Sequence, residues 1–231
     1  MWAALAMLPA LGLCIWAGLW QLDRSEEKRR LFLEYDSVSD SDMLAALPPE
    51  SLAPGYRYRR FMVRGRYDSD RQILLDSMLH EGRVGYQVLT PLLMGTSAVL
   101  INRGWIAADA DRSVIPDVTV DDQIRYVRGR LDLLPRPGIK SSPVDVPGDA
   151  SWPRRLLYPT PEQIEQQLGI ALYDYQLLLD AADPDGFTRE WRPQVMGPER
   201  HVGYAVQWFS FAVALCIIFY VVNRKQVGTH E

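Results

Sequence analysis

The sequence predicts a membrane protein of mixed α and β structure, in which two transmembrane helices flank one soluble domain. Residues 2–22 and 203–222 are apolar stretches that each reach the roughly 20 residues a helix needs to cross a bilayer. Residues 23–200 carry short runs of alternating polar and apolar positions, which favours a mostly antiparallel sheet with a few short helices. Strands joined in order by short turns also favour a sheet that curls toward a barrel. Residues 223–231 form a short tail, expected in the cytoplasm.

The first apolar stretch is expected to be a retained helix and not a cleaved signal peptide. Its apolar part exceeds the usual length of about 7–15 residues, and it has neither a basic start nor a small-residue cleavage site. Pro9 predicts a kink that neighbouring groups can accommodate. The helix is expected to continue through Glu34. A second short helix is expected at residues 40–46, stopped by Pro48 and Pro49.

The soluble segment predicts six strands, one hairpin and one capped helix. His80 to Arg83, containing Gly82, has the composition of a hairpin turn. Thr160 is the expected N-cap of a helix that ends at Gly169, with Pro161 at its first position and Gln163 reaching back. A proline-rich loop is expected at residues 135–153. The expected strands lie within residues 56–68, 71–79, 84–93, 98–106, 122–134 and 171–180.

Composition and missing motifs exclude several functions. The formal net charge of −4 argues against nucleic acid as a partner, which requires a basic patch. HExxH, CxxCH, CxxxC, GxGxxG, P-loop and GxSxG motifs are all absent, so neither hydrolysis nor another catalytic activity is expected. Cys14 and Cys216 lie inside the apolar stretches, where they are expected to be packing residues, and no copper site is expected.

His201 is the strongest candidate for a binding residue, because it opens the second apolar stretch. Tyr204 and Trp208 follow it at helical spacing, and Arg200 precedes it. Imidazole is a common ligand of haem iron, aromatic walls suit a porphyrin, and an arginine can pair with a propionate. The same residues would also suit an aromatic belt at the membrane surface. The small residues Ala205 and Ala212, which share this helix face, would let another helix or a flat ligand approach closely.

Five motifs in order resemble the Surfeit-locus 1 family of cytochrome oxidase assembly factors. Together they span nearly the whole chain, which makes the resemblance specific although each motif alone is weak. They are GLWQLDRSEEK at residues 18–28, GRYD at 65–68, GYQVLTPL at 85–92, INRGW at 101–105 and RHVGYAVQWFSFA at 200–212.

The resemblance implies a multi-pass protein of the bacterial inner membrane with its soluble domain in the periplasm. It implies a role in maturing the catalytic subunit of a haem–copper oxidase, by holding haem a supplied by haem a synthase. It assigns His201 as the iron ligand, and the helical spacing described above places Tyr204, Trp208 and Arg200 beside it. It also marks a set of partner-binding or structural residues: Trp20, Gln21, Arg24, Gly65, Gly85, Pro91, Asn102, Arg103, Gly104 and Trp105.

Two other functions remain open from the sequence. A cofactor-free membrane chaperone could stabilise the oxidase subunit during assembly. A membrane-anchored sensor or ligand-binding protein is disfavoured, because the residues after Val222 are too few for a signalling domain. Within the soluble motifs, Gly65, Gly85 and Gly104 are expected to allow close backbone approach or positive φ. Arg103 is expected either to pack or to hold a carboxylate.

Overall fold

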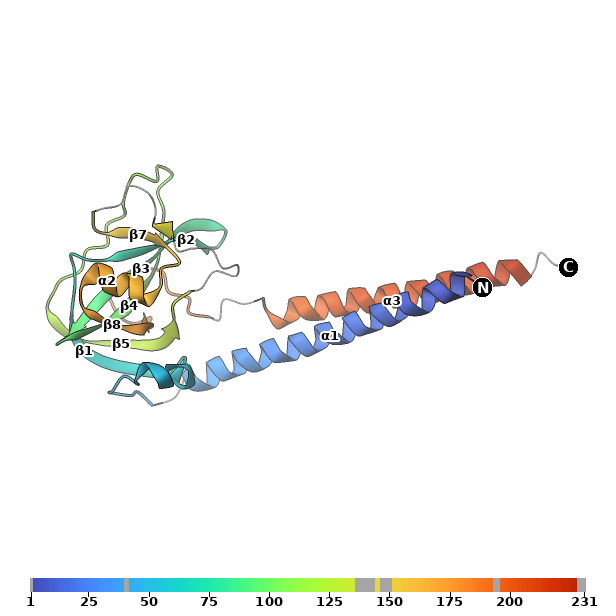
Figure 1. The fold of residues 1–231 in the computed structure, drawn as a ribbon, viewed down its shortest axis with the longest axis horizontal. Helices are drawn as coiled ribbons and strands as arrows, with labels where there is room; N and C mark the ends of the chain where they lie inside the picture. Colours follow the sequence, from blue (N-terminus) through green and yellow to red (C-terminus); the bar gives the residue numbers. More distant parts are fainter. Residues whose placement is uncertain (1, 40–41, 136–143, 146–150, 193–195, 228–231) are drawn as a thin grey trace. The chain divides into compact units, whose positions relative to one another are not determined.

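The computed structural model describes most of the chain in two compact units. The units are Met1–Asp36 together with Arg192–Glu231, and Ser37–Trp191. Each is described here by itself, and Figure 1 shows their elements. The description omits residues 1, 40–41, 136–143, 146–150, 193–195 and 228–231, and also the side chains at 2–6, 39, 144–145 and 225–227.

The first unit is a pair of long helices, α1 (Trp2–Ser39) and α3 (Pro198–Val227). Small residues form the seam between them: Cys14, Ala17, Ala205 and Ala212 are all at most 7% exposed. Gly18 lies so close to Phe209 that an added Cβ would come within 2.6 Å of the ring. The small residues of α3 could admit either another helix or a flat ligand. In this structure they contact the helix α1.

Only one helix within the described residues is long and apolar enough to cross a membrane, the stretch Pro198–Arg224 of α3. This agrees with the second expected span. The first expected span, residues 2–22, is helical. Over the described residues of α1, however, no stretch is both long and apolar enough to cross a membrane. Side chains at 2–6, the start of that span, fall outside the description. As expected, α1 continues past Glu34, to Ser39.

The second unit is built on a closed ring of five strands, as the barrel expectation required. Around the ring the order is β1–β5–β8–β4–β3, and β3 pairs again with β1 through Arg66↔Leu93 and Tyr67↔Leu92. The pairs are antiparallel except for β4 with β8. The strands are β1 (Arg60–Tyr67), β2 (Ile73–His80), β3 (Arg83–Met94), β4 (Ser97–Ala107), β5 (Ile124–Leu133), β6 (Val144–Asp145), β7 (Arg154–Leu157) and β8 (Ala171–Leu179).

The main core lies where the ring strands turn their apolar positions toward one another. Phe61, Val127, Ile101 and Leu177 are fully buried there. This follows from the period-two alternation, which places every second residue of a strand on one face. Strands β2, β7 and β6 extend the sheet beyond β3. The turn between β2 and β3 places Glu81 and Gly82 at positive φ, which confirms the expected hairpin.

Helix α2 (Pro161–Leu168) has the expected caps. The side chain of Thr160 accepts from the backbone of Gln163, the Gln163 side chain accepts from the backbone of Thr160, and Gly169 ends the helix with φ of 66°. Its buried face, Ile164 and Leu168, belongs to a second apolar cluster with β2, β3 and β4. Polar residues cover the other face.

The prediction of a helix at residues 40–46 was wrong where the structure describes it. Leu44 is extended and pairs with Phe61, donating to the carbonyl of Arg60 and accepting from the N–H of Met62. The free edge of β1 thus satisfies this backbone better than one isolated helical turn would. A short 3₁₀ helix, η1 (Glu50–Tyr56), follows instead. The expected loop at residues 135–153 lies mostly outside the described residues, and β7 was not expected.

Candidate functional site

The motifs at the inner ends of the two long helices meet through one hydrogen bond. Nδ1 of His201 on α3 lies 2.8 Å from Oε1 of Gln21 on α1. One turn along α1, the hydroxyl of Ser25 donates to the carbonyl of Pro198 at 3.1 Å. Gln21, Ser25 and His201 are all half-buried. Residues far apart in the sequence therefore form one local arrangement at the start of α3.

This contact suits one tautomer of His201. With the Gln21 oxygen as the acceptor, Nδ1 donates its proton, and Nε2 of the neutral imidazole then holds the lone pair. No described residue bonds Nε2. An imidazole oriented through one nitrogen, with the other one free, is the arrangement typical of a metal-ligating histidine. The donor chemistry at His201 thus fits a haem iron.

Trp20 and Arg24 flank Gln21 on α1 and contact each other. The guanidinium of Arg24 lies over the Trp20 ring at 5.7 Å from its centroid, and it also pairs with Glu27 at 2.5 Å. The hydrogen bond from Arg24 lowers the pKa of Glu27 from its usual value. Trp20 is 43% exposed. These contacts stay within α1 and hold its surface charges in place.

The other residues predicted beside His201 differ in their exposure on α3. Tyr204 is 45% exposed, and the half-buried Trp208 contacts Phe211 edge-on with ring centroids 5.9 Å apart. Arg200 is exposed, and its side chain makes no hydrogen bond or ion pair with a described residue. Since α1 occupies the alanine seam, a flat ligand at His201 would have to lie toward Tyr204 and Trp208.

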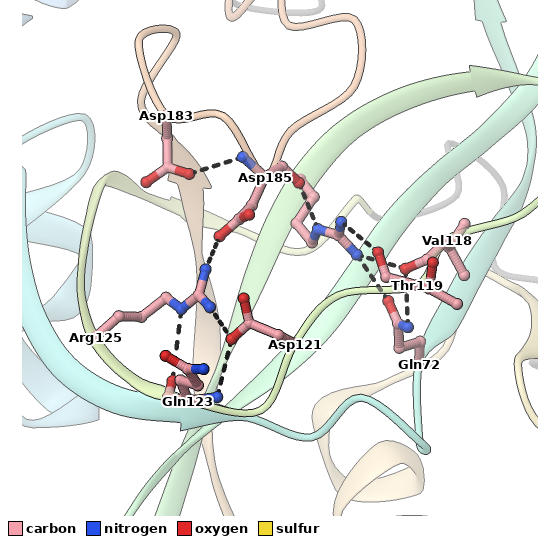
Figure 2. A network of polar contacts seen from close by, with 9 residues as sticks. Gln72, Val118, Thr119, Asp121, Gln123, Arg125, Asp183 and Asp185 are labelled. Carbon is pink, nitrogen blue, oxygen red and sulfur yellow. Dashed lines mark hydrogen bonds and ion pairs between the residues drawn. The ribbon is translucent and has the colours of Figure 1, made fainter.

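Arg103 lies buried inside the soluble unit, and its polar atoms are engaged there. Its guanidinium donates to Oε1 of Gln72 at 3.0 Å and to the carbonyls of Val118, Thr119 and Asp185 at 2.7, 3.3 and 2.7 Å. Figure 2 shows these acceptors around it, next to the Arg125–Asp185 pair. Burial lowers the pKa of Arg103 from its usual value. The geometry favours the packing alternative over a hold on an external carboxylate.

Asn102 joins three strands of the ring. It is fully buried, and its amide nitrogen donates to Gln87 on β3 and to Gln176 on β8, both at 3.0 Å. Its oxygen accepts from the N–H of Gly104. A buried amide with all these partners specifies strand register, because a shifted strand would leave the group unsatisfied.

Close approach explains the motif glycines, as expected. A Cβ at Gly85 would meet the carbonyl of Ile106 at 2.2 Å and the Trp105 ring at 2.5 Å, and one at Gly65 would meet Leu92 at 2.7 Å. Gly104 has a φ of 109°, which a side chain would strain. The Trp105 indole donates to the carbonyl of Met78 at 2.8 Å.

Pro91 lies where β3 changes partners. Strand β3 pairs with β2 up to Leu89 and with β1 from Leu92 onward. The residue between these pairings needs no ladder N–H, so proline is tolerated there. Its carbonyl accepts from the N–H of Asp68 at 2.8 Å, which ties the GRYD and GYQVLTPL motifs together.

Sequence reasoning missed the residues that complete these networks. Gln72, Gln87 and Gln176 are polar residues in or beside expected strands, and Gln72 and Gln176 are buried. Polar residues on an inward strand position were the available signal. Over the described residues, no group of three or more His, Cys, Asp and Glu side chains is placed to hold a metal ion. The two cysteines are free, Cys14 buried and Cys216 exposed.

Comparison with known proteins agrees with the motif order. The SURF1 family model matches residues 8–213. A SURF1-like protein of Rickettsia felis is 23% identical, over 96% of this chain and 97% of its own length. An uncharacterized SURF1-like protein of Mycobacterium bovis is 25% identical, over 84% of this chain and 72% of its own. The match covers both helices and the strand ring, and the chain therefore belongs to the SURF1 family.

Proposed function

We propose that this protein assists assembly of a haem–copper oxidase by holding haem a before its insertion into the catalytic subunit. The family is associated with cytochrome oxidase assembly. The observation that carries the haem proposal is the Gln21–His201 hydrogen bond, which leaves Nε2 of His201 with a free lone pair. In this proposal haem a synthase supplies the haem and the oxidase subunit receives it.

Several residues of the helix pair have separate tasks in this proposal. His201 binds the iron, and Gln21 holds the imidazole in the ligating tautomer. Tyr204 and Trp208 provide an aromatic wall, and the exposed Arg200 pairs with a propionate. The bound haem a would supply a redox-active iron and a hydrophobic tail that needs shelter from water. The chain is proposed to be a carrier and not an enzyme.

The direct test is an absorption spectrum of the full-length protein, purified in mild detergent from cells that make haem a. We expect a haem a spectrum in the wild-type protein. A matched preparation from cells without haem a synthase is the control, because it reports nonspecific uptake of other haems. Protein free of haem a from the first cells would contradict the proposal.

A cofactor-free docking role is the second candidate, because the outer face of β1 and β5 is suited to a partner. Arg64 lies opposite Tyr126 and Arg66 opposite Ile124, and both Tyr126 and Ile124 are 63% exposed. The Arg64 side chain makes no hydrogen bond or ion pair with a described residue. Arginine and tyrosine are enriched where proteins bind each other. Haem-free protein that loses oxidase assembly in an Arg64→Glu variant would favour this function.

We also propose that both long helices cross the inner membrane and place the soluble unit in the periplasm. The apolar residues of α1, from Trp2 to Leu22, support this beside the span in α3. A reporter active only outside the cytoplasm, inserted within residues 135–153, should be active. A reporter active only inside is the matched control, and its activity at this position would reverse the orientation.

A further inference from the structure

The first unit contains an open groove that the proposed function does not use. It has a volume of about 730 Å³ and lies between the outer part of α1 and the residues that begin α3. The hydrogen bond from Ser25 to the Pro198 carbonyl lies at its lining. The groove therefore starts one turn beyond Gln21, on the side away from the apolar stretch.

Four charged side chains line the groove, two of each sign. They are Arg29 and Asp36 from α1, and Arg192 and Glu199 from the other segment. All four are exposed, and none makes a hydrogen bond or ion pair with any residue that the structure describes. Opposite charges that share a groove without pairing remain available to a ligand. Their balance favours a ligand that carries both signs, since carboxylates would repel a purely anionic one.

The rest of the lining is largely apolar. Phe32 and Leu33 of α1 and Val202 of α3 contribute to it, and Leu33 is 60% exposed. Apolar residues beside charged ones suit an amphiphilic ligand, whose chains and headgroup need different surroundings.

The inner end of the groove, at Ser25, Arg29 and Pro198, lies at the height of lipid headgroups. The helix able to cross a membrane begins at Pro198, which lines the groove. Arg29 is one turn beyond Ser25, about 6 Å along the axis at 1.5 Å per residue. The headgroup layer is about 5–8 Å thick on each side of the hydrocarbon core. The exposed Trp20 and Tyr204 next to this level are typical of the membrane interface.

We propose that this groove binds a zwitterionic phospholipid with a primary ammonium, such as phosphatidylethanolamine. The arginines hold its phosphate, the carboxylates accept hydrogen bonds from its ammonium, and the apolar wall contacts its glycerol and upper chains. A lipid bound in this way would hold the groove-lining residues of α1 against the start of α3. The inference is independent of haem binding.

The test is native mass spectrometry of the full-length protein in mild detergent. Phosphatidylethanolamine, phosphatidylcholine and phosphatidylglycerol are added at equal concentration. We expect about fivefold stronger retention of phosphatidylethanolamine, in line with one or two exposed charge contacts. Arg29→Gln should weaken retention of all three lipids severalfold. Glu199→Gln, next to Pro198, should weaken only phosphatidylethanolamine and remove its advantage over phosphatidylcholine, whose quaternary ammonium cannot donate a hydrogen bond.

Arg30→Gln is the matched control, because Arg30 is adjacent on α1 but pairs with Glu26 and does not line the groove. It should leave lipid retention unchanged. Equal retention of the three lipids, or no effect of Arg29→Gln and Glu199→Gln, would reduce the groove to ordinary solvated surface. Preference for phosphatidylglycerol would also overturn the proposal, since it would indicate an anion site. Haem content measured on the same samples reports separately on the proposed function.

Discussion

His201→Ala should reduce the haem a content of the purified protein at least tenfold while the protein stays folded in the membrane. Alanine has no side-chain nitrogen, so the variant lacks the lone pair that Nε2 of His201 would offer to the iron. His201→Gln should behave in the same way, because glutamine keeps hydrogen bonding but is a poor iron ligand. The measurement is the haem a absorbance per protein, with helix content from circular dichroism as the check on folding.

Neighbouring variants separate ligation from general packing. Gln21→Leu keeps the volume but frees the imidazole, and loss of such an orienting bond typically costs 10–100-fold in metal affinity. Trp208→Phe should be milder, since an aromatic wall remains. Tyr204→Phe should have a large effect only where the hydroxyl bonds the haem or a partner. Unchanged haem content in both His201 variants would return His201 to the aromatic belt.

Arg103→Leu should lower the melting temperature of the soluble unit by about 10 °C. The substitution removes one donor from Gln72 and from the carbonyls of Val118, Thr119 and Asp185. Gln72 keeps the bond from Thr90 and Val118 keeps the bond from Gln72, so the carbonyls of Thr119 and Asp185 are the acceptors that lose most. Each buried acceptor left unsatisfied costs about 1–3 kcal/mol, so a loss of roughly 3–5 kcal/mol is expected. For a domain of this size, 1 kcal/mol corresponds to about 2–4 °C. Thermal unfolding followed by tryptophan fluorescence measures the change.

Two further variants test whether the lost stability comes from the hydrogen bonds of Arg103. Arg103→Lys keeps the positive charge but cannot reach four acceptors with one ammonium, so it should lose most of the same stability. Arg64→Leu is the matched surface control, and its effect should stay within about 0.5 kcal/mol. A shift below 2 °C for Arg103→Leu would mean that water or rearrangement satisfies the acceptors, and that the network is not a stability determinant.

The local elements of the fold could be predicted from the sequence because their signals are local. Alternation identified the main strands, Glu81-Gly82 the hairpin, and Thr160 with Gln163 the capped helix. Strand pairing could not be predicted in the same way. The parallel contact of β4 with β8 joins segments separated by β5 and α2, and no short pattern encodes it. Leu44 was misassigned because the edge of β1 overrode its local preference.

In the candidate site, too, local features could be predicted from the sequence and long-range contacts could not. An ionisable residue at the edge of an apolar stretch singled out His201 without further information. Its partner Gln21 is 180 residues away in the sequence, so only the packing of the two helices brings them together. The INRGW residues were noticed as a motif, but their networks depend on glutamines from three other segments, of which Gln72 and Gln176 are buried. The contact at His201 and the buried INRGW network therefore involve different motifs.

The position of β8 in the ring has a consequence for the order of biosynthesis. It lies between β4 and β5, yet it is the last strand to be made, ending at Leu179. Until it arrives, β4 and β5 each present an open edge with unpaired N–H and C=O groups, which attract other strands. The ring therefore cannot close until the ribosome has nearly reached α3. The open edges of β4 and β5 therefore stay exposed for most of the synthesis of this chain, since its longest-range contacts form last.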